Sequence, residues 1–135
     1  MSIRQQITGT GVAIITPFAQ NESVDFEALG RVIDYIIAGG AEYIVTLGTT
    51  GETPVLSKEE KADIIRFTME KVDQRVPVIV GIGGNNTRAV AADMQSLPLD
   101  GALAVLSASP YYNKPSQEGI LQHYQHLAKA CPKPI

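Results

Sequence analysis

The sequence contains no tryptophan and only one cysteine, Cys131, among its 135 residues. A disulfide within the chain is therefore impossible, and a reducing compartment such as the cytoplasm is expected. No apolar run approaches the roughly 18 residues of a membrane-spanning helix, and the first residues contain no apolar core of a secretory signal. We therefore expect neither a membrane partner nor secretion.

An excess of positive charge is also missing. The chain has 11 Lys and Arg residues against 14 Asp and Glu residues, which gives a formal net charge of -3. Because nucleic-acid binding needs Lys and Arg concentrated against phosphates, no nucleic-acid partner is expected. With 44% hydrophobic and 19% charged residues, the composition is that of an ordinary globular protein, and the length allows one domain.

Four apolar segments recur along the chain, and none of them alternates apolar with polar residues. They span residues 12–16, 43–47, 78–82 and 102–106. Continuous apolar strands of this kind are typical of a sheet that is covered on both faces, and such sheets are mostly parallel. The pattern therefore predicts four buried parallel strands.

Helical patterns fill the intervals between these segments. Apolar residues recur at helical spacing over 29–37. Ser57 and Glu60 form a capping box, which is a signature of a helix start, and we expect Thr87 and Ser116 to cap two further helices. The predicted order is therefore β-α-β-α-β-α-β-α.

Two architectures accept this order, a doubly wound open sheet and a (β/α)8 barrel of the TIM type. The barrel takes about 250 residues, so this chain would supply roughly its first four βα units. The last residues, Lys133-Pro134-Ile135, have the pattern of a fifth strand at its beginning. We interpret residues 1–135 as the N-terminal half of a barrel domain, truncated at the start of the fifth strand. A complete flavodoxin-like sheet is the alternative.

Polar residues gather just after the predicted strands, where ligands of parallel α/β sheets bind. The sharpest segment is GTTGE at residues 48–52, because two threonine hydroxyls and free backbone amides can together hold a small carboxylate or phosphate. A plain turn, in which both threonines bond their own backbone, is the alternative. After the fourth strand come Tyr111 and Tyr112, whose phenols can pass a proton along a hydrogen-bonded chain or simply pack their rings.

The placement of lysine and histidine argues against two other kinds of site. A Schiff-base lysine needs a pKa depressed by burial, and no lysine lies in a predicted strand. The last predicted helix should bury Ile120, Leu121, Tyr124, Leu127 and Ala128. His123 and His126 flank that face, so we expect both on the solvated surface, and two histidines alone make an incomplete metal site. We expect no metal and no cofactor. The lysines are Lys58, Lys61, Lys71, Lys114, Lys129 and Lys133.

Four segments resemble the dihydrodipicolinate synthase family, and the likeness as a whole extends from about residue 9 to the end of the chain. They are GVAIITP at 11–17, GTTGE at 48–52, PVIVG at 77–81 and SPYYNKPSQEG at 109–119. The resemblance implies a (β/α)8 barrel in which pyruvate forms a Schiff base with a buried lysine. The enamine then condenses with L-aspartate-4-semialdehyde, an early step of diaminopimelate and lysine biosynthesis.

The same resemblance implies roles for individual residues. Thr50 would bind the pyruvate carboxylate, and Thr49 and Tyr112 would be two members of a three-hydroxyl proton relay. The family's tyrosine at the position of Tyr112 reaches into a neighbouring subunit, so a homo-oligomer, a dimer or a tetramer, is implied. The third relay tyrosine and the Schiff-base lysine of the family would lie beyond Ile135, so we expect these 135 residues alone to be inactive.

A regulatory site is also implied, with a departure. In feedback-inhibited relatives lysine binds between subunits, and Asn85 and Tyr111 match two of its contact positions. Ala89 stands at the acidic position, and Lys58 and Lys61 stand at histidine positions. Because the ammonium group of the effector would lose its carboxylate partner and meet like charge, weak or no inhibition by lysine is expected.

Two other functions stay open at this point. One is a related pyruvate-dependent lyase that acts on sialic acid or sugar acids. The other is a non-catalytic half barrel that binds small carboxylates, or that assembles with a partner covering its open sheet edges.

Overall fold

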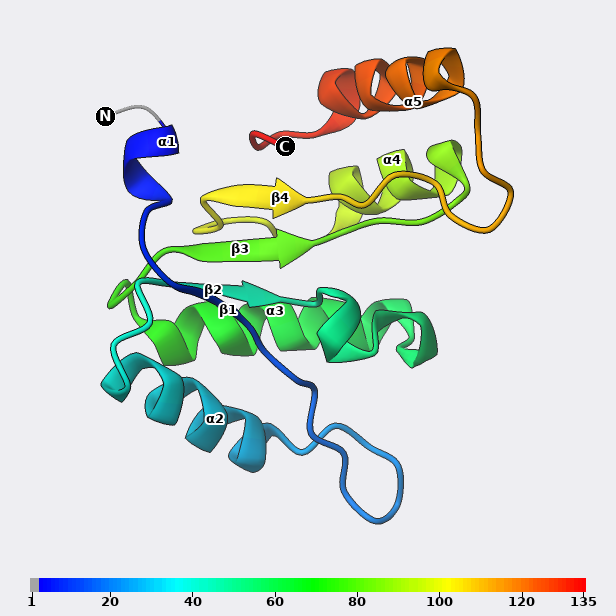
Figure 1. Ribbon diagram of the computed structural model, residues 1–135. Helices are drawn as coiled ribbons and strands as arrows, with labels where there is room; N and C mark the ends of the chain where they lie inside the picture. The colour runs from blue at the N-terminus through cyan, green and yellow to red at the C-terminus, as the bar shows by residue number, and fades with distance from the viewer. Residues whose placement is uncertain (1–2) are drawn as a thin grey trace.

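The computed structural model describes residues 3–135, and within this range strands and helices alternate along the chain (Figure 1). No helix in this range is both long enough and apolar enough to cross a membrane. The strands are β1 (Gly11–Ala13), β2 (Tyr43–Thr46), β3 (Val78–Gly81) and β4 (Ala104–Leu106). The α-helices are α1 (Ile3–Gln6), α2 (Phe26–Ala38), α3 (Lys58–Val72), α4 (Thr87–Ser96) and α5 (Gln117–Ala130), and two 3-10 helices, η1 (Thr49–Gly51) and η2 (Thr53–Val55), follow β2.

The four strands form one parallel sheet in the order β1-β2-β3-β4 (Figure 1). A flavodoxin-like sheet would place the first strand between the second and the third. Each strand instead pairs with the one that precedes it in the chain, as in a TIM barrel. The four predicted strands are confirmed, each one or two residues shorter than expected, and the half barrel is confirmed over the open sheet.

Two of the predicted helix starts are confirmed by their hydrogen bonds. The Ser57 hydroxyl accepts a hydrogen bond from the Glu60 amide at 3.1 Å, and the Glu60 carboxylate accepts one from the Ser57 amide at 2.8 Å. The Ser116 hydroxyl caps α5 by accepting from the Gly119 amide at 3.1 Å. These bonds satisfy amides that the first helical turn leaves without intrahelical partners.

The predicted cap of α4 is wrong by one residue. Asn86 is the cap, because its side-chain oxygen accepts a hydrogen bond from the Ala89 amide at 3.2 Å. Thr87 is the first helical residue, and its hydroxyl is bonded to His123 of α5 at 2.8 Å. The threonine therefore serves a contact between two helices that the local sequence does not reveal.

One face of the sheet carries the main core. Side chains of β2, β3 and β4 on this face pack together with buried residues of α2, α3, α4 and α5 in a single cluster. Alternate residues of a strand point to opposite faces of a sheet, and the strand residues of this cluster all lie on one face. All four longer helices therefore cover the same side of the sheet, which is the outer side of a barrel. The central members are Ile33, Ile44, Ile65, Val78, Val80, Met94, Val105 and Leu127.

The other face of the sheet has its own smaller cluster. Val45, Ile79 and Ala104 lie side by side across β2, β3 and β4 and are buried. Ile3 and Ile7 pack on them from α1 and the residue after it, a segment for which the sequence analysis predicts no helix or strand. The helix α1 lies at the amino-terminal side of the sheet (Figure 1). At the other end of this face Leu106 is 53% exposed, so the inner face is covered only in part.

The final residues run beside β4. The Val105 amide donates a hydrogen bond to the Pro134 carbonyl at 2.8 Å. The same type of bond joins the Ile44 amide of β2 to the Pro77 carbonyl, directly before β3, at 3.0 Å. Pro134 therefore lies against β4 as Pro77 lies against β2.

The buried face of α5 differs from the predicted one. His123 is only 3% exposed, whereas Leu121 is 51% exposed and Ala128 is also exposed. The expectation that His123 lies on the solvated surface is therefore wrong, and His126 is exposed as expected. The reason is that α5 packs on α4, where Thr87 offers the imidazole a hydrogen-bond partner.

Candidate active site at the carboxyl edge of the sheet

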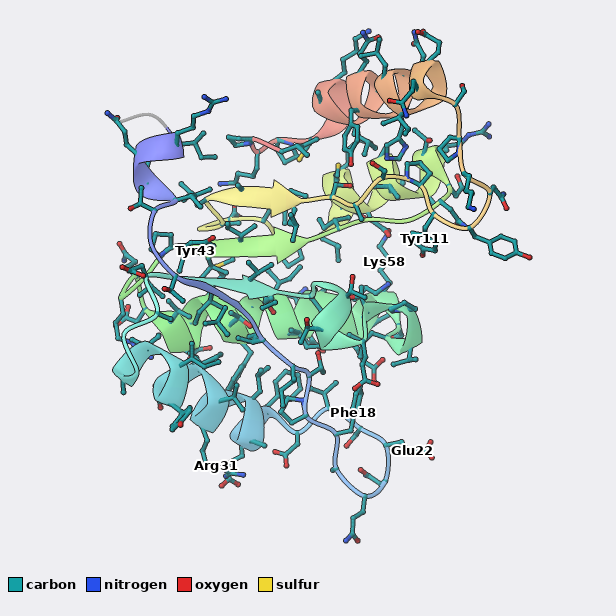
Figure 2. The ribbon with its side chains drawn as sticks, in the orientation of Figure 1. Phe18, Glu22, Arg31, Tyr43, Lys58 and Tyr111 are labelled. Carbon is teal, nitrogen blue, oxygen red and sulfur yellow. The ribbon has the colours of Figure 1, made fainter. Side chains whose placement is uncertain are left out.

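The loops that follow the strands meet along one edge, because all four strands run in parallel. Thr49 and Thr50 follow β2, Asn85 follows β3, and Tyr111 and Tyr112 follow β4. In Figure 2 the labelled Tyr111 lies on the side toward which the strand arrows point. The candidate residues therefore share the edge at which ligands of parallel α/β sheets bind.

Threonine side chains from outside the GTTG turn hold the backbone of the loop after β2. The Thr16 hydroxyl, which is buried, donates to the Gly51 carbonyl at 2.8 Å. The Thr53 hydroxyl lies 2.7 Å from the Leu47 carbonyl and 3.0 Å from the Gly48 carbonyl. Two threonines from outside the GTTG turn thus hold two of its carbonyl oxygens and the carbonyl of Leu47 directly before it.

This anchoring leaves the predicted threonines available to a ligand. Thr49 and Thr50 are exposed at the start of η1. The amides of Gly51 and Glu52 bond back to the carbonyls of Gly48 and Thr49, at 2.9 and 3.1 Å. The first amides of a helix have no intrahelical acceptor, so the amides and hydroxyls of Thr49 and Thr50 form a small group of donors. Such a group suits a carboxylate.

The backbone passes close to β3 on its way into this loop. Leu47 has a positive φ of 56°. A Cβ atom at Gly81 would lie 2.2 Å from the Leu47 carbonyl oxygen and 2.7 Å from the Gly48 amide nitrogen. Only a glycine at position 81 leaves room for the loop to take this path.

The loop after β4 presents the two predicted phenols to solvent. Tyr112 is 88% exposed and Tyr111 is 52% exposed. Tyr112 and Lys114 both adopt left-handed backbone conformations, with φ of 70° and 48°. Each such residue costs on the order of 1–3 kcal/mol and persists only where its surroundings fix it, which is common in functional loops.

Tyr124 of α5 holds the first residues of this loop. Its hydroxyl donates to the Ser107 carbonyl at 2.8 Å, and the Ser109 hydroxyl lies 3.2 Å from the Tyr124 hydroxyl oxygen. The Ser107 hydroxyl is buried and has no partner among the described residues.

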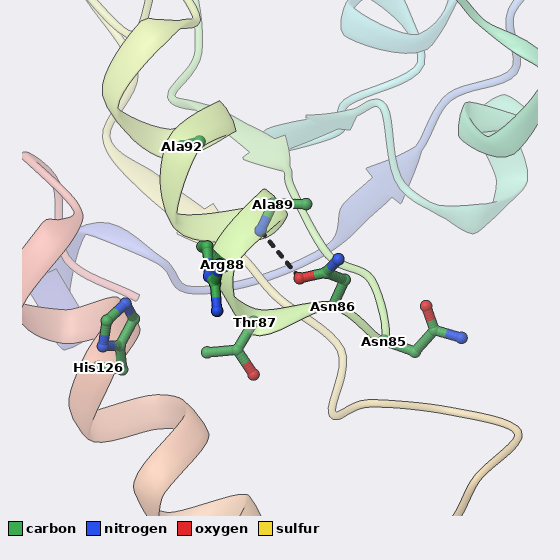
Figure 3. A pocket seen from close by; sticks show the side chains of 7 residues that line it. All are labelled: Asn85, Asn86, Thr87, Arg88, Ala89, Ala92 and His126. Carbon is green, nitrogen blue, oxygen red and sulfur yellow. Dashed lines mark hydrogen bonds between the residues drawn. The ribbon is translucent and has the colours of Figure 1, made fainter.

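The predicted effector positions are brought together only in part. Asn85 and Ala89 line a surface groove of about 940 Å³ at the start of α4, whose far wall is His126 of α5 (Figure 3). Tyr111 is not among the residues that line this groove. Lys58 lies beside α4, with its ammonium nitrogen 4.0 Å from a carboxylate oxygen of Asp93.

The placement of the lysines agrees with the sequence analysis. None of the six lies in a strand, and none is buried. Residues 3–135 contain no group of three or more His, Cys, Asp or Glu side chains that could hold a metal ion. Burial, with the nearby His126, holds the pKa of His123 below its usual range. The ring nitrogen Nε2 of His123 is buried and has no partner among these residues.

Sequence reasoning missed the residues that support the site. Thr16 ends the first apolar segment and Thr53 follows GTTGE, so both were visible as hydroxyls near a predicted strand end. Their targets are carbonyl groups five to 35 positions away along the chain, and Tyr124 bonds a residue 17 positions before it. A regular spacing signal exists for none of these pairs.

Residues 6–135 match the sequence model of the Dihydrodipicolinate synthetase family. The chain belongs to this family. The 4-hydroxy-tetrahydrodipicolinate synthase of Parabacteroides distasonis is 51% identical over 129 residues, which are 96% of this chain and 43% of that protein. The synthase of Phocaeicola vulgatus is 48% identical over 133 residues, which are 98% of this chain and 45% of that protein.

A solved structure of the family shows the same half barrel. The chloride-inhibited dihydrodipicolinate synthase from Acinetobacter baumannii, complexed with pyruvate, matches with a TM-score of 0.90 and 40% sequence identity. The match covers 95% of this chain and 44% of that chain. The chain described here therefore spans less than half the length of the synthases that it matches.

Proposed function

We propose that this chain is the N-terminal half of a Schiff-base-forming synthase of the dihydrodipicolinate synthetase family. The whole enzyme would condense pyruvate with L-aspartate-4-semialdehyde in lysine and diaminopimelate biosynthesis, in the cytoplasm. The observation that carries the proposal is the anchored η1 loop. It presents the hydroxyls of Thr49 and Thr50 at the same sheet edge as the Tyr112 loop.

In this proposal the chain supplies substrate binding and proton transfer but not the nucleophile. Thr50, with the first amides of η1, binds the pyruvate carboxylate. Thr49 and Tyr112 pass protons as the Schiff base forms and as the enamine attacks the aldehyde. The lysine that forms the Schiff base comes from the second half of the barrel, which agrees with the absence of a buried lysine among residues 3–135.

A homo-oligomer is part of the same proposal. A tyrosine that is 88% exposed and held in a left-handed conformation is poorly placed to serve only its own chain. We assign Tyr112 to the site of a neighbouring copy. Lysine is a weak effector or none in this proposal, because Ala89 supplies no carboxylate to the groove beside Asn85.

The experiment joins this chain to the part of the Parabacteroides distasonis synthase that follows its matched segment, and measures condensation of pyruvate with L-aspartate-4-semialdehyde. Thr49→Val and Tyr112→Phe should each lower kcat by about 100-fold, the usual contribution of a proton-transfer group. Thr50→Ala should mainly raise KM for pyruvate.

Matched controls are available in the same chain. Thr10→Val changes an exposed threonine ahead of β1, and Tyr35→Phe changes an exposed tyrosine on α2. Both should keep the activity of the parent fusion. An active fusion in which Thr49→Val and Tyr112→Phe turn over as fast as these controls would refute the assigned roles.

A further inference from the structure

We propose that Tyr124 is a positioning residue, whose hydroxyl fixes the loop that carries Tyr112 and thereby sets where the Tyr112 phenol is presented. This inference rests on the proposed function, since it concerns the placement of a group that the proposed reaction uses. The contact itself is independent of that function. Nothing in the reaction requires Tyr124 to touch a substrate.

Tyr124 contacts the first residues of the loop after β4. The Tyr124 hydroxyl donates to the Ser107 carbonyl at 2.8 Å, directly after β4, and lies 3.2 Å from the Ser109 hydroxyl. Only Pro110 and Tyr111 separate Ser109 from Tyr112. Proline fixes its own φ and restricts the residue before it, so the position of Ser109 is passed on to Tyr112 through a stiff connection.

The other end of the loop is fixed as well. Ser116 caps α5 through the Gly119 amide at 3.1 Å. Between the two fixed ends lie the left-handed residues Tyr112 and Lys114. Left-handed non-glycine residues relax unless the chain on both sides holds them. On the side toward β4, the hydrogen bonds of the Tyr124 hydroxyl with Ser107 and Ser109 hold the chain.

Tyr124 is itself held by its neighbours and not by the loop. Its ring is partly buried against the main core. It meets the ring of His123 edge to face, with ring centres 5.2 Å apart. His123 in turn is bonded to Thr87 at the start of α4. The hydroxyl therefore projects from a fixed ring, which is what a positioning group requires.

The loop after β2, which carries Thr49 and Thr50, is held by residues other than Tyr124. Its carbonyls are held by Thr16 and Thr53, from the segment after β1 and from η2. Loss of the Tyr124 hydroxyl should therefore disturb the Tyr112 loop without disturbing the residues assigned to pyruvate. In a complete enzyme this predicts a lower kcat with an unchanged KM for pyruvate.

The test is amide hydrogen exchange on the 135-residue chain, with Tyr124→Phe compared with the parent chain. Exchange at the Asn113 amide, which donates to the Tyr111 carbonyl at 2.9 Å, should rise about fivefold, the effect of losing one ordinary hydrogen bond, while amides within α5 exchange as before. Tyr35→Phe removes the same hydroxyl group from an exposed tyrosine and should change nothing. Ser109→Ala, which keeps the bond to Ser107, should give a smaller rise.

The outcomes separate the two proposals. Unchanged exchange at the Asn113 amide in Tyr124→Phe would overturn the positioning role, and so would a rise that extends equally through α5. If Tyr124→Phe does not fold, an unchanged loop in Ser109→Ala overturns it. In the fusion enzyme, kcat should fall about fivefold in Tyr124→Phe with KM for pyruvate unchanged. A Tyr112→Phe fusion of full activity would instead refute the proposed function and leave the exchange result standing.

Discussion

Gly81 offers the sharpest test of how the site is built. A Cβ atom placed there would lie 2.2 Å from the Leu47 carbonyl oxygen, 2.5 Å from the Leu47 carbonyl carbon and 2.7 Å from the Gly48 amide nitrogen. Ordinary contacts of a Cβ atom are 3.4–4 Å, so the β2–η1 connection would have to retreat by more than about 1 Å. All three atoms belong to the backbone and cannot swing aside as a side chain does.

Gly81→Ala should therefore cost about 3 kcal/mol of unfolding free energy, the upper part of the range for overpacking. In a urea titration followed by circular dichroism, the midpoint should fall by roughly 1.5 M at an unchanged slope, which for a small domain is near 2 kcal/mol per M. In the fusion enzyme the displaced loop should also raise KM for pyruvate, because it carries the threonines assigned to the carboxylate.

Gly48→Ala is the matched control, since it adds the same methyl group one residue after Leu47. Gly48 has φ of -69°, which any residue adopts, and its Cβ would meet only a methyl group of Val45 at 3.8 Å. This variant should lose less than about 1 kcal/mol. Equal urea midpoints for the two variants would refute the reasoning about the close approach.

Three further predictions concern other parts of the chain. Ser57→Ala removes the capping box of α3 and should lower the free energy of unfolding by about 1 kcal/mol, seen as a lower melting temperature, whereas an unchanged melt would contradict the role of the cap. Burial holds the pKa of His123 in the folded chain below its usual value, whereas in the unfolded chain this side chain takes up a proton near pH 6.5. Stability should thus be full above that pH and fall as the pH drops below it, and His123→Gln should flatten this slope in urea titrations between pH 7 and 5. Incubation of the chain with pyruvate and borohydride should give no pyruvyl adduct by mass spectrometry, because no lysine is buried; an adduct on any lysine would show that a nucleophile is present after all.

The elements with a strong local signal were predictable. The four strands, the capping box at Ser57 and the cap at Ser116 follow from residues close together in the chain, and all are present. The strand order required a choice between two architectures, and the pattern of a fifth strand beginning at Lys133-Pro134-Ile135, together with the family resemblance, favoured the half barrel, which the strand order confirms. The helix α1 has four residues and no periodic pattern, so composition alone could not reveal it.

The sequence predicts at which edge of the sheet the candidate residues lie, but it does not predict the hydrogen bonds that hold their loops. Polar residues after each apolar segment lie along one edge of the sheet, as the parallel pattern predicts. The bonds that shape this edge join distant residues, such as Thr16 to Gly51 and Tyr124 to Ser107. His123 illustrates the same limit, because a histidine is normally assigned to the surface unless a partner is known. Its partner, Thr87, lies 36 positions earlier in the chain.

The strand order described above bears on how the chain folds during synthesis. Since every strand of this sheet pairs with its immediate predecessor, no strand has to wait for a distant segment before it finds its neighbour. Each βα unit that emerges from the ribosome can add to the edge left by the previous one. We therefore expect the four strands to join this sheet in the order in which they are synthesised.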